Sequence, residues 1–221
     1  MPTSVKILHT EPVTHDVRHY RVERPDGFQF KPGQATEVAL DKDGWRDEKR
    51  PFTFTALPDA DTLEFTIKSY HDHDGVTHEL WSMQAGDALL LDEPWGTITY
   101  KGPGVFIAGG AGVTPFIAIL RKLAADGKLD GHTLIASHKT EKDIILREEF
   151  EAMDGLDCIW TVTGQDGSEL DRGKIDKGFL QHHVRDFDQQ FYVCGPDEMI
   201  DDIKSTLKEL GADADGITFE E

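Results

Sequence analysis

The spacing of apolar residues changes near residue 102, and this change limits the folds that the chain can adopt. Before it, short segments rich in β-branched and aromatic residues are separated by turn sequences such as Arg-Pro-Asp-Gly and Lys-Pro-Gly. After it, strand-like apolar runs alternate with amphipathic segments of helical spacing. The sequence therefore predicts two domains within its 221 residues, 1–101 and 102–221.

The first domain is predicted to be a small antiparallel β-barrel. Its strand-like segments follow one another without intervening helices, which is typical of such barrels. One helix is expected near residues 76–83, where Leu80 and Met83 can face the core. The expected strands include residues 5–10, 17–23, 35–40, 52–57 and 63–70.

The second domain is predicted to be a parallel α/β sheet with helices on both faces, because strands and helices alternate along it. The expected strands are 104–109, 132–137, 158–163, 190–195 and 217–220. The expected helices lie near 115–125, 146–153, 174–184 and 197–210. In the last of these, apolar residues recur at helical spacing.

Charge and composition narrow the range of partners. Acidic residues number 42 and basic residues 23, for a net charge of −19. A surface this acidic repels nucleic acid and anionic lipid, so we expect neither as a partner. No run of eighteen apolar residues occurs and the start does not read as a secretory leader, so we expect no membrane insertion. Only Cys158 and Cys194 are present, which favours a reducing cytoplasm over a disulfide framework.

A glycine-rich segment follows the strand predicted at 104–109. It reads Gly109-Gly110-Ala111-Gly112-Val113-Thr114-Pro115. Glycines allow a tight turn and let backbone N–H groups approach a phosphate. Thr114 suits a helix N-cap and Pro115 the first helical position. The segment lacks the third glycine of the dinucleotide fingerprint and the Gly-Lys-Ser/Thr of a Walker loop. We expect a nucleotide pyrophosphate site, with an ordinary tight turn as the alternative.

Several segments, in this order, resemble the ferredoxin–NADP reductase superfamily over nearly the whole chain. They are Phe30-Lys31-Pro32-Gly33-Gln34, Arg50-Pro51-Phe52-Thr53, Thr66-Ile67-Lys68-Ser69-Tyr70, Gly75-Val76-Thr77, Gly110 to Pro115, and Tyr192-Val193-Cys194-Gly195-Pro196 with Met199. The resemblance implies an FAD-binding barrel followed by a domain that binds NADH or NADPH. It implies an enzyme that passes hydride to FAD and then electrons to a separate acceptor: a ferredoxin, flavodoxin, cytochrome or small molecule. FMN is the less favoured flavin, because Gly75–Thr77 supplies a second phosphate-binding helix start.

The resemblance also assigns residues. Flavin binding is expected at Arg50, Pro51, Phe52, Thr53, Thr66, Ile67, Lys68, Tyr70, Gly75, Val76, Thr77 and Phe219. Nucleotide binding is expected at Gly110, Ala111, Gly112, Val113, Thr114, Pro115, Lys139, Asp143, Cys194, Gly195 and Pro196. Direct roles in catalysis are expected for Thr53, Cys194 and Glu220. Each also has an ordinary alternative, such as surface cation, core side chain or helix cap.

Physical arguments support the main flavin assignments. Arg50 presents a planar fork of donors to a phosphate, Phe52 a flat face to a conjugated ring, and Thr53 a hydroxyl to a ring nitrogen. Cys194 is expected at the carboxyl end of a parallel strand as a group that positions the nicotinamide, with a small buried hydrophobe as the alternative.

The numbers and spacing of the cysteines and histidines argue against an iron–sulfur module and a metal site. A plant-type iron–sulfur module needs four cysteines, so electrons must leave the flavin for another molecule. His71-Asp72-His73 and His182-His183 are expected to be solvated, and no metal site is expected.

The choice between NADH and NADPH is expected to lie after the strand at 132–137, a stretch that resembles the NADH–cytochrome b reductases. Asp143 or Glu141 can accept from a free 2′-hydroxyl and repel a 2′-phosphate, whereas Ser137 and Lys139 can bind that phosphate. Lysine cannot form the bidentate contact with a phosphate that arginine forms, so Lys139 is a weak ligand for a 2′-phosphate. This favours NADH over NADPH.

Two questions stay open at this level. The chain can instead be a non-enzymatic dinucleotide sensor, although a sensor has no need of the flavin signature at 50–53. An acidic ferredoxin or flavodoxin fits a charge of −19 poorly unless the four basic residues Lys42, Arg46, Lys49 and Arg50 form a patch.

Overall fold

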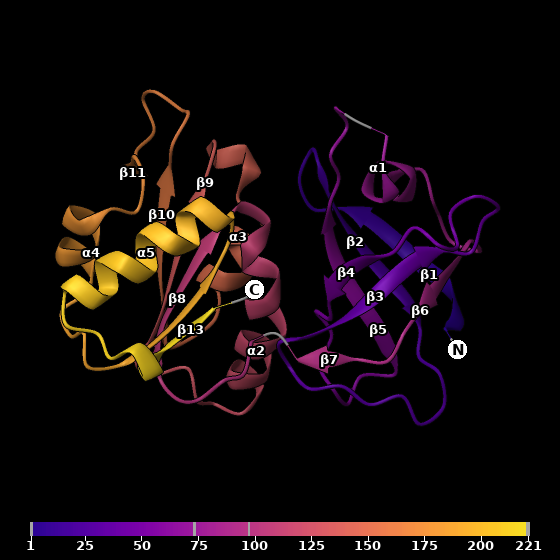
Figure 1. Ribbon diagram of the computed structural model, residues 1–221, viewed down its shortest axis with the longest axis horizontal. Coiled ribbons are helices and arrows are strands. Elements are labelled where there is room, and N and C mark those ends of the chain that lie inside the picture. The colour runs from indigo at the N-terminus through magenta and orange to yellow at the C-terminus, as the bar shows by residue number, and fades with distance from the viewer. Residues whose placement is uncertain (1, 73, 97, 220–221) are drawn as a thin grey trace. The chain divides into compact units, whose positions relative to one another are not determined.

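The computed structural model describes residues 2–72, 74–96 and 98–219 (Figure 1). The chain divides into two compact units. The barrel unit consists of Met1–Thr97 and Thr114–Lys122, and the α/β unit consists of Ile98–Val113 and Leu123–Glu221. The expected domain limits, 1–101 and 102–221, follow chain order instead of this spatial grouping and stay a prediction.

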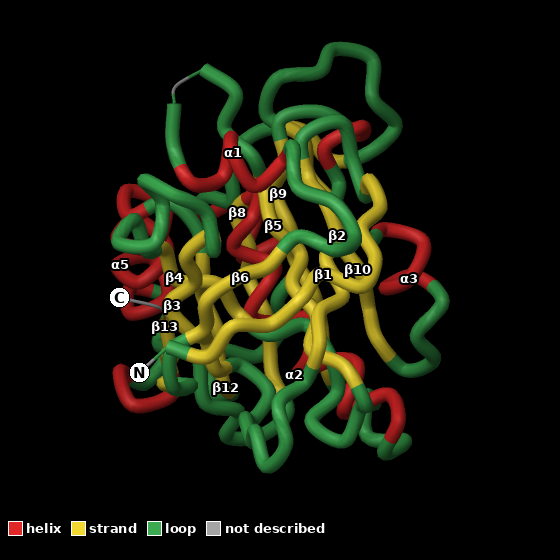
Figure 2. The backbone as a smooth tube through the Cα atoms, turned by 90° about the vertical axis from the view of Figure 1, so that its right-hand side faces the viewer, coloured by secondary structure: helices red, strands yellow, loops and turns green. Residues whose placement is uncertain are grey.

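The barrel unit contains an antiparallel sheet in the spatial order β4-β3-β6-β1-β2-β5 (Figure 2). The strands are β1 (Thr3–Pro12), β2 (Val17–Glu23), β3 (Gln34–Leu40), β4 (Arg50–Thr53), β5 (Thr62–Lys68) and β6 (Ala88–Leu91), and β7 (Trp95–Gly96) pairs with β3. The outer strands nearly meet, because Phe54 bridges to Phe65 and the Thr55 N–H donates to the Glu64 carbonyl at 2.8 Å. The sheet is therefore a nearly closed barrel, which confirms the predicted fold.

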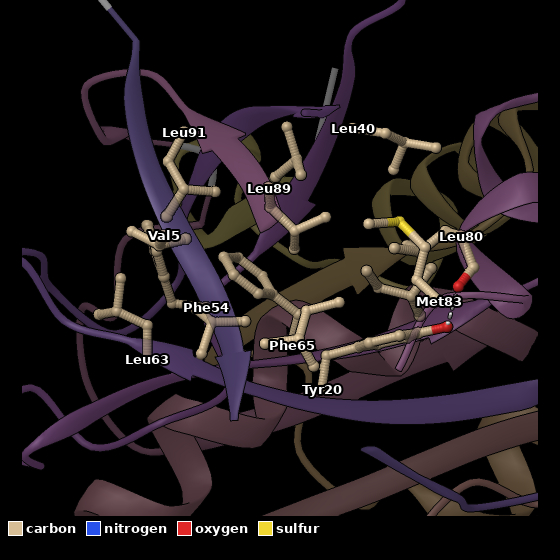
Figure 3. Close-up of a cluster of buried hydrophobic side chains, with 14 of the residues drawn as sticks. Val5, Tyr20, Leu40, Phe54, Leu63, Phe65, Leu80, Met83, Leu89 and Leu91 are labelled. Carbon is tan, nitrogen blue, oxygen red and sulfur yellow. Dashed lines mark hydrogen bonds between the residues drawn. The ribbon is translucent and has the colours of Figure 1, made fainter. Parts of the chain in front are cut away.

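The barrel core follows from the alternation of apolar residues along its strands. On β5, Leu63, Phe65 and Ile67 point inward and are at most 3% exposed. Figure 3 shows Tyr20 lying in this core with its hydroxyl aimed at helix α1 (Val76–Trp81), where it donates to the Leu80 carbonyl at 3.0 Å. Burial raises the pKa of Tyr20 to about 12, so the hydroxyl stays a donor.

Helix α2 (Thr114–Ala125) starts one residue before the expected position. Its residues through Lys122 group with the barrel unit, and there Arg121 donates to the Thr55 carbonyl at 2.8 Å. The Arg121 guanidinium also lies 3.2 Å from the Glu64 carboxylate, whose other neighbour is His19 at 3.3 Å.

The α/β unit contains a parallel sheet in the order β11-β10-β9-β8-β12-β13. Its strands are β8 (Gly104–Gly109), β9 (His132–His138), β10 (Leu156–Val162), β11 (Asp171–Arg172), β12 (Gln190–Cys194) and β13 (Ile217–Phe219). Its helices are α3 (Arg147–Glu151), α4 (Lys177–His183) and α5 (Asp197–Glu209), with 3-10 turns at Gly110–Val113, Glu141–Asp143 and Ala214–Gly216. Parallel strands alternating with helices confirm the predicted α/β domain.

The core of this unit explains its sequence pattern. Every residue of β8 is buried, as expected for a central strand covered on both faces. Helix α5 buries Ile200, Ile203 and Leu207 in the same cluster as Phe191 and Val193 of β12. Asp201 and Asp202 between them are exposed, which is the amphipathic pattern seen in the sequence.

The segment that enters this unit is held by one phenol. The hydroxyl of Tyr192, a fully buried residue, accepts from the backbone N–H groups of Lys101 and Gly102 at 2.9 and 3.0 Å and donates to the Gly102 carbonyl at 2.7 Å. Tyr100 stacks on the Tyr192 ring and hydrogen-bonds His132 at 2.9 Å. Residues 100–102 are thereby part of the α/β unit. Among the described residues, no helix is both long and apolar enough to cross a lipid bilayer.

Candidate functional site

The glycine-rich segment forms a 3-10 turn that leads from β8 directly into α2. Gly110 adopts φ +54°, a left-handed conformation that favours glycine. Among the described residues, a Cβ added at Gly110 would meet no atom within 4 Å, so this side of the turn is open. Val113 and Pro115 are buried and anchor the turn. The turn has the form that suits a phosphate group at a helix start.

Cys194, Gly195 and Pro196 lie against this turn. Strand β12 pairs with β8 so that Cys194 is opposite Ala108. A Cβ added at Gly112 would overlap the Cys194 carbonyl, and one added at Gly195 would lie 3.1 Å from the Gly109 nitrogen. The structure thus brings together two segments that the sequence indicated separately. Cys194 itself is only 6% exposed.

The carboxyl edge of the parallel sheet also holds a cavity of about 230 Å³. It is lined by Ser137, Thr163, Lys174, Ile175, Pro196, Glu198, Met199, Asp202 and Ile203. Ser137, Pro196 and Met199 were indicated by the sequence, whereas Thr163, Lys174, Glu198 and Asp202 were not. Their only sequence signal is a position shortly after a strand or in the first half of α5, which does not reveal that they share a cavity.

The segment after β9 is folded by local hydrogen bonds. Asp143 accepts from the backbone N–H and the hydroxyl of Thr140 at 2.7 and 2.8 Å, which forms a capping box. Glu141 accepts from the Gln165 amide at 2.9 Å and the Ser168 hydroxyl at 2.7 Å. Lys139 is exposed. The two acidic residues proposed to read the ribose therefore already have partners.

In the barrel unit, Arg50 begins β4 with its side chain 52% exposed. Its guanidinium donates to the Lys49 carbonyl at 2.6 Å and lies 3.9 Å from Glu48. Because a guanidinium carries five N–H donors, most of its capacity stays available, which fits a role in holding a phosphate. Pro51 is exposed, Phe52 is partly buried against the barrel core and Thr53 is 7% exposed.

Two residues of the second predicted flavin segment have buried side chains. Thr66 and Ile67 are at most 4% exposed, so a ligand can reach them mainly through the backbone. Lys68 forms an ion pair with Asp16 at 3.0 Å. Burial opposes ionisation of Asp16, but hydrogen bonds from Lys68 and Thr14 outweigh it and lower the pKa of Asp16.

The start of α1 is shaped by its neighbours. Gly75 is the N-cap and Val76 is buried. The Thr77 hydroxyl accepts from the Tyr70 N–H at 3.4 Å, while the Thr77 carbonyl accepts from Ser69 at 2.8 Å. Tyr70 is 46% exposed. The segments 66–70 and 75–77 are therefore neighbours, as the resemblance requires of one cofactor site.

At the end of the chain, Phe219 lies on β13, and the Lys204 ammonium sits 3.4 Å from the centre of its ring. Glu220 lies outside the described residues. Of the histidines, His71 packs on the rings of His78 and Trp81, and His183 lies 3.0 Å from Asp171. His73 also falls outside the described residues.

The four basic residues near the flavin signature do not form a free basic patch. Lys42 pairs with Glu79, Arg46 with Asp41 and Asp43, Lys49 with Asp92, and Arg50 lies nearest Glu48. Each of these positive charges has a carboxylate within 4 Å, so the four residues contribute no excess of positive charge.

Two family models match the chain. The oxidoreductase FAD-binding domain matches residues 4–100, and the oxidoreductase NAD-binding domain matches residues 106–205. The two domains therefore occur in the order that the sequence predicts.

The relatives include several kinds of reductase. NADH-cytochrome b5 reductase 2 of Mycosarcoma maydis is 27% identical, over 94% of this chain and 69% of its own. The reductase component of propane 2-monooxygenase from Mycolicibacterium goodii is 27% identical, over 89% of this chain and only 60% of its own. Ferredoxin–NADP reductase B of Sorangium cellulosum is 27% identical, and the match covers 95% of this chain and 93% of that protein.

Solved structures show the same fold. A ferredoxin NADP+ reductase from Neisseria gonorrhoeae, with bound FAD and NADP, has a TM-score of 0.86 at 23% identity, covering 99% of this chain and 98% of its own. The CS-b5R domains of human Ncb5or have a TM-score of 0.88 at 24% identity, and the match covers 100% of this chain and 70% of that one. With an FAD-binding and an NAD-binding domain in this order, the chain belongs to the ferredoxin–NADP reductase superfamily of flavin-dependent NAD(P)H oxidoreductases.

Proposed function

We propose that this chain takes hydride from NADH onto bound FAD and passes the electrons to a separate acceptor. The observation that carries the proposal is the contact between the Gly110–Val113 turn and the Cys194–Pro196 segment. Ligands of open α/β sheets bind at the carboxyl ends of the strands, and this contact lies there. The turn offers N–H groups to a pyrophosphate, and the neighbouring segment offers a surface for the nicotinamide.

The nucleotide side acts by positioning. Backbone N–H groups of the turn, at the start of α2, hold the pyrophosphate where the helix dipole favours negative charge. Cys194 is buried at a strand end, so it supports the nicotinamide ring and is not a nucleophile. Holding the two reacting rings in contact supplies the main catalytic effect of the protein.

The flavin side acts in the same way. When bound, FAD supplies the centre that accepts the hydride and releases electrons. Arg50 would hold a flavin phosphate, Phe52 would pack on the ring, and the Thr53 hydroxyl would donate to a ring nitrogen. The buried side chains of Thr66 and Ile67 keep this wall rigid, so their backbone groups are fixed in place.

Loss of flavin from an Arg50 variant tests this assignment. Arg50→Ala should be isolated with little yellow cofactor, because a charge-assisted phosphate contact is removed. Arg46→Ala is the matched control, since Arg46 is already paired with Asp41 at 2.8 Å and with Asp43 at 2.6 Å. Flavin content is measured by visible absorbance, and the flavin released by heat is identified by chromatography as FAD or FMN.

The same preparation separates the enzyme from a dinucleotide sensor. A yellow protein that NADH bleaches without oxygen supports the oxidoreductase. A colourless protein that cannot be reconstituted with flavin favours the sensor, and equal flavin content in Arg50→Ala and the parent rules out the role given to Arg50.

The acceptor is proposed to be a protein with a basic docking face or a small molecule. Relatives are named for cytochrome b5, a monooxygenase and ferredoxin. The net charge of −19 and the paired state of the basic residues disfavour an acidic acceptor. We place the reaction in the cytoplasm, because the chain has only two cysteines, Cys158 and Cys194, and no disulfide joins them.

A further inference from the structure

We propose that Glu198 and Asp202 select a nucleotide whose ribose carries a free 2′-hydroxyl, and that they do so in the cavity at the carboxyl edge of the α/β sheet. The inference rests on the proposed use of a nicotinamide nucleotide. It adds the residues that distinguish NADH from NADPH.

The cavity has the size and place for one part of a dinucleotide. Its volume of about 230 Å³ is below the roughly 300–1,000 Å³ of pockets that enclose a drug-sized ligand. It therefore suits a nucleoside-sized group. Ser137 is the last but one residue of β9, Thr163 follows β10, Lys174 lies just after β11, and α5 starts after β12. The lining therefore comes from four parallel strand ends.

The cavity adjoins the glycine turn. Pro196 and Met199 line it, and the same two residues lie against Gly109, where an added Cβ would come within 2.9 Å of Pro196 and overlap Met199. A dinucleotide whose pyrophosphate sits on the turn can therefore place its adenosine end in the cavity without leaving the sheet edge.

The walls differ in character. Ile175 and Ile203 are buried and provide apolar surface for the flat face of a base or sugar. Ser137 and Thr163 provide hydroxyl groups, which can donate and accept hydrogen bonds. This combination of apolar surface and few polar groups is typical of small-molecule sites.

The charges decide which ribose fits. Glu198 and Asp202 are four residues apart on α5, so they lie on the same face of the helix. Lys174 is the one positively charged residue in the cavity lining. Within the described chain, none of the three has an ion-pair partner within 4 Å. Two carboxylates against one ammonium give the lining a charge of −1.

A 2′-phosphate brings about −1.5 to −2 further charges at neutral pH. Two carboxylates repel it, and a single lysine attracts it only as a point charge. A free 2′-hydroxyl instead donates a charge-assisted hydrogen bond to a carboxylate. The positive end of α5 would favour an anion, but Asp197 and Glu198 in its first turn already offset this effect.

The acids after β9 are less suited to this task. Asp143 caps the Glu141–Asp143 turn, and Glu141 accepts two hydrogen bonds from side chains. Turning either toward a ribose would break these bonds. Glu198 and Asp202 are exposed, so binding a ribose would not require their side chains to break hydrogen bonds of this kind.

The test compares paired nucleotides on the flavin-loaded protein. We expect the parent to bind 5′-AMP more tightly than 2′,5′-ADP by calorimetry and to show the higher kcat/KM with NADH. The double variant Glu198→Gln with Asp202→Asn should narrow both preferences at least tenfold. Asp201→Asn is the control, because it removes one charge from the same helix outside the cavity lining.

The other results overturn the inference. For the variants, these results are an unchanged nucleotide preference in the double variant or an equally large change of preference in Asp201→Asn. For the parent, they are a preference for 2′,5′-ADP or a failure to bind 5′-AMP. A change found only in Asp143→Ser assigns the selectivity to the segment after β9 instead. If NADH does not bleach the flavin but the 5′-AMP preference behaves as expected, the proposed function fails and the nucleotide selectivity stands.

Discussion

Gly110 and Gly112 are two residues apart, yet each must be glycine for a different reason. Gly110 needs a left-handed backbone and faces open space, whereas Gly112 has no room because the Cys194 carbonyl lies where a Cβ would be. The first glycine leaves an approach for a ligand, and the second allows two protein segments to touch. The glycine-rich motif contains both residues, and the sequence alone does not show which glycine faces a ligand and which one allows close packing.

Alanine at these two positions should therefore give different defects. Gly112→Ala should lower the melting temperature, because overpacking of this kind costs about 1–3 kcal/mol. Gly110→Ala should cost less stability, about 1 kcal/mol of backbone strain, but raise the KM for NADH by placing a methyl group on the open face. Thermal unfolding and steady-state kinetics measure both, and equal melting temperatures would contradict the packing argument.

The residues at 50–53 and 110–115 were predictable because each motif is contiguous, and its local chemistry is visible in the sequence. Glu198, Lys174 and Thr163 were not, because they meet only through the crossovers of the parallel sheet. The choice of Asp143 followed from its place after β9, but its capping bonds to Thr140 appear only in three dimensions.

At the scale of elements, β5 illustrates how one strand is held. Its Glu64 carboxylate lies between His19 of β2 and Arg121 of α2. The proximity of His19, together with the charge of Arg121, outweighs the effect of burial and lowers the pKa of Glu64. A carboxyl whose pKa is lower when folded stabilises the protein above its unfolded pKa and loses this contribution as pH falls.

Glu64→Gln should therefore weaken the acid dependence of stability. The parent is expected to lose unfolding free energy as the pH falls below 4.5, the ordinary pKa of glutamate, and the variant should lose less over the same range. Urea unfolding between neutral and acidic pH measures this. Glu93→Gln, at an exposed position, is the control and should keep the slope of the parent.

The two longest helices were predicted closely, whereas the short strands β6, β7 and β11 were not predicted. Helices α2 and α5 begin within one residue of the expected positions, because twelve or thirteen residues carry a clear repeat. Strand β6 with four residues, and β7 and β11 with two each, carry too little pattern to recognise. They form because neighbouring strands offer free hydrogen-bonding edges.

At the scale of the whole molecule, charge should govern the choice of acceptor. Reduction of a basic cytochrome should slow when ionic strength rises from about 0.01 M to about 0.1 M, because the Debye length falls from about 30 Å to about 10 Å. Ferricyanide, a small anion, should react faster over the same range. Stopped-flow rates decide the point, and a cytochrome rate that does not respond to salt would count against the acidic docking surface.

The fold as a whole was accessible from sequence because motif order and element order agree along nearly the full chain. Whatever depends on distance between separated segments was not accessible, including the burial of Thr66 and the pairing of Arg46 with Asp41 and Asp43.

The Tyr192 hydroxyl has a further consequence for the rate at which backbone protons exchange with solvent water. The amides of Lys101 and Gly102 lie in the segment joining the two predicted domains, where rapid exchange is the ordinary expectation. Both instead donate to a phenol oxygen that is inaccessible to water. Their deuterium uptake should therefore follow the opening of the β12 core and not that of a linker.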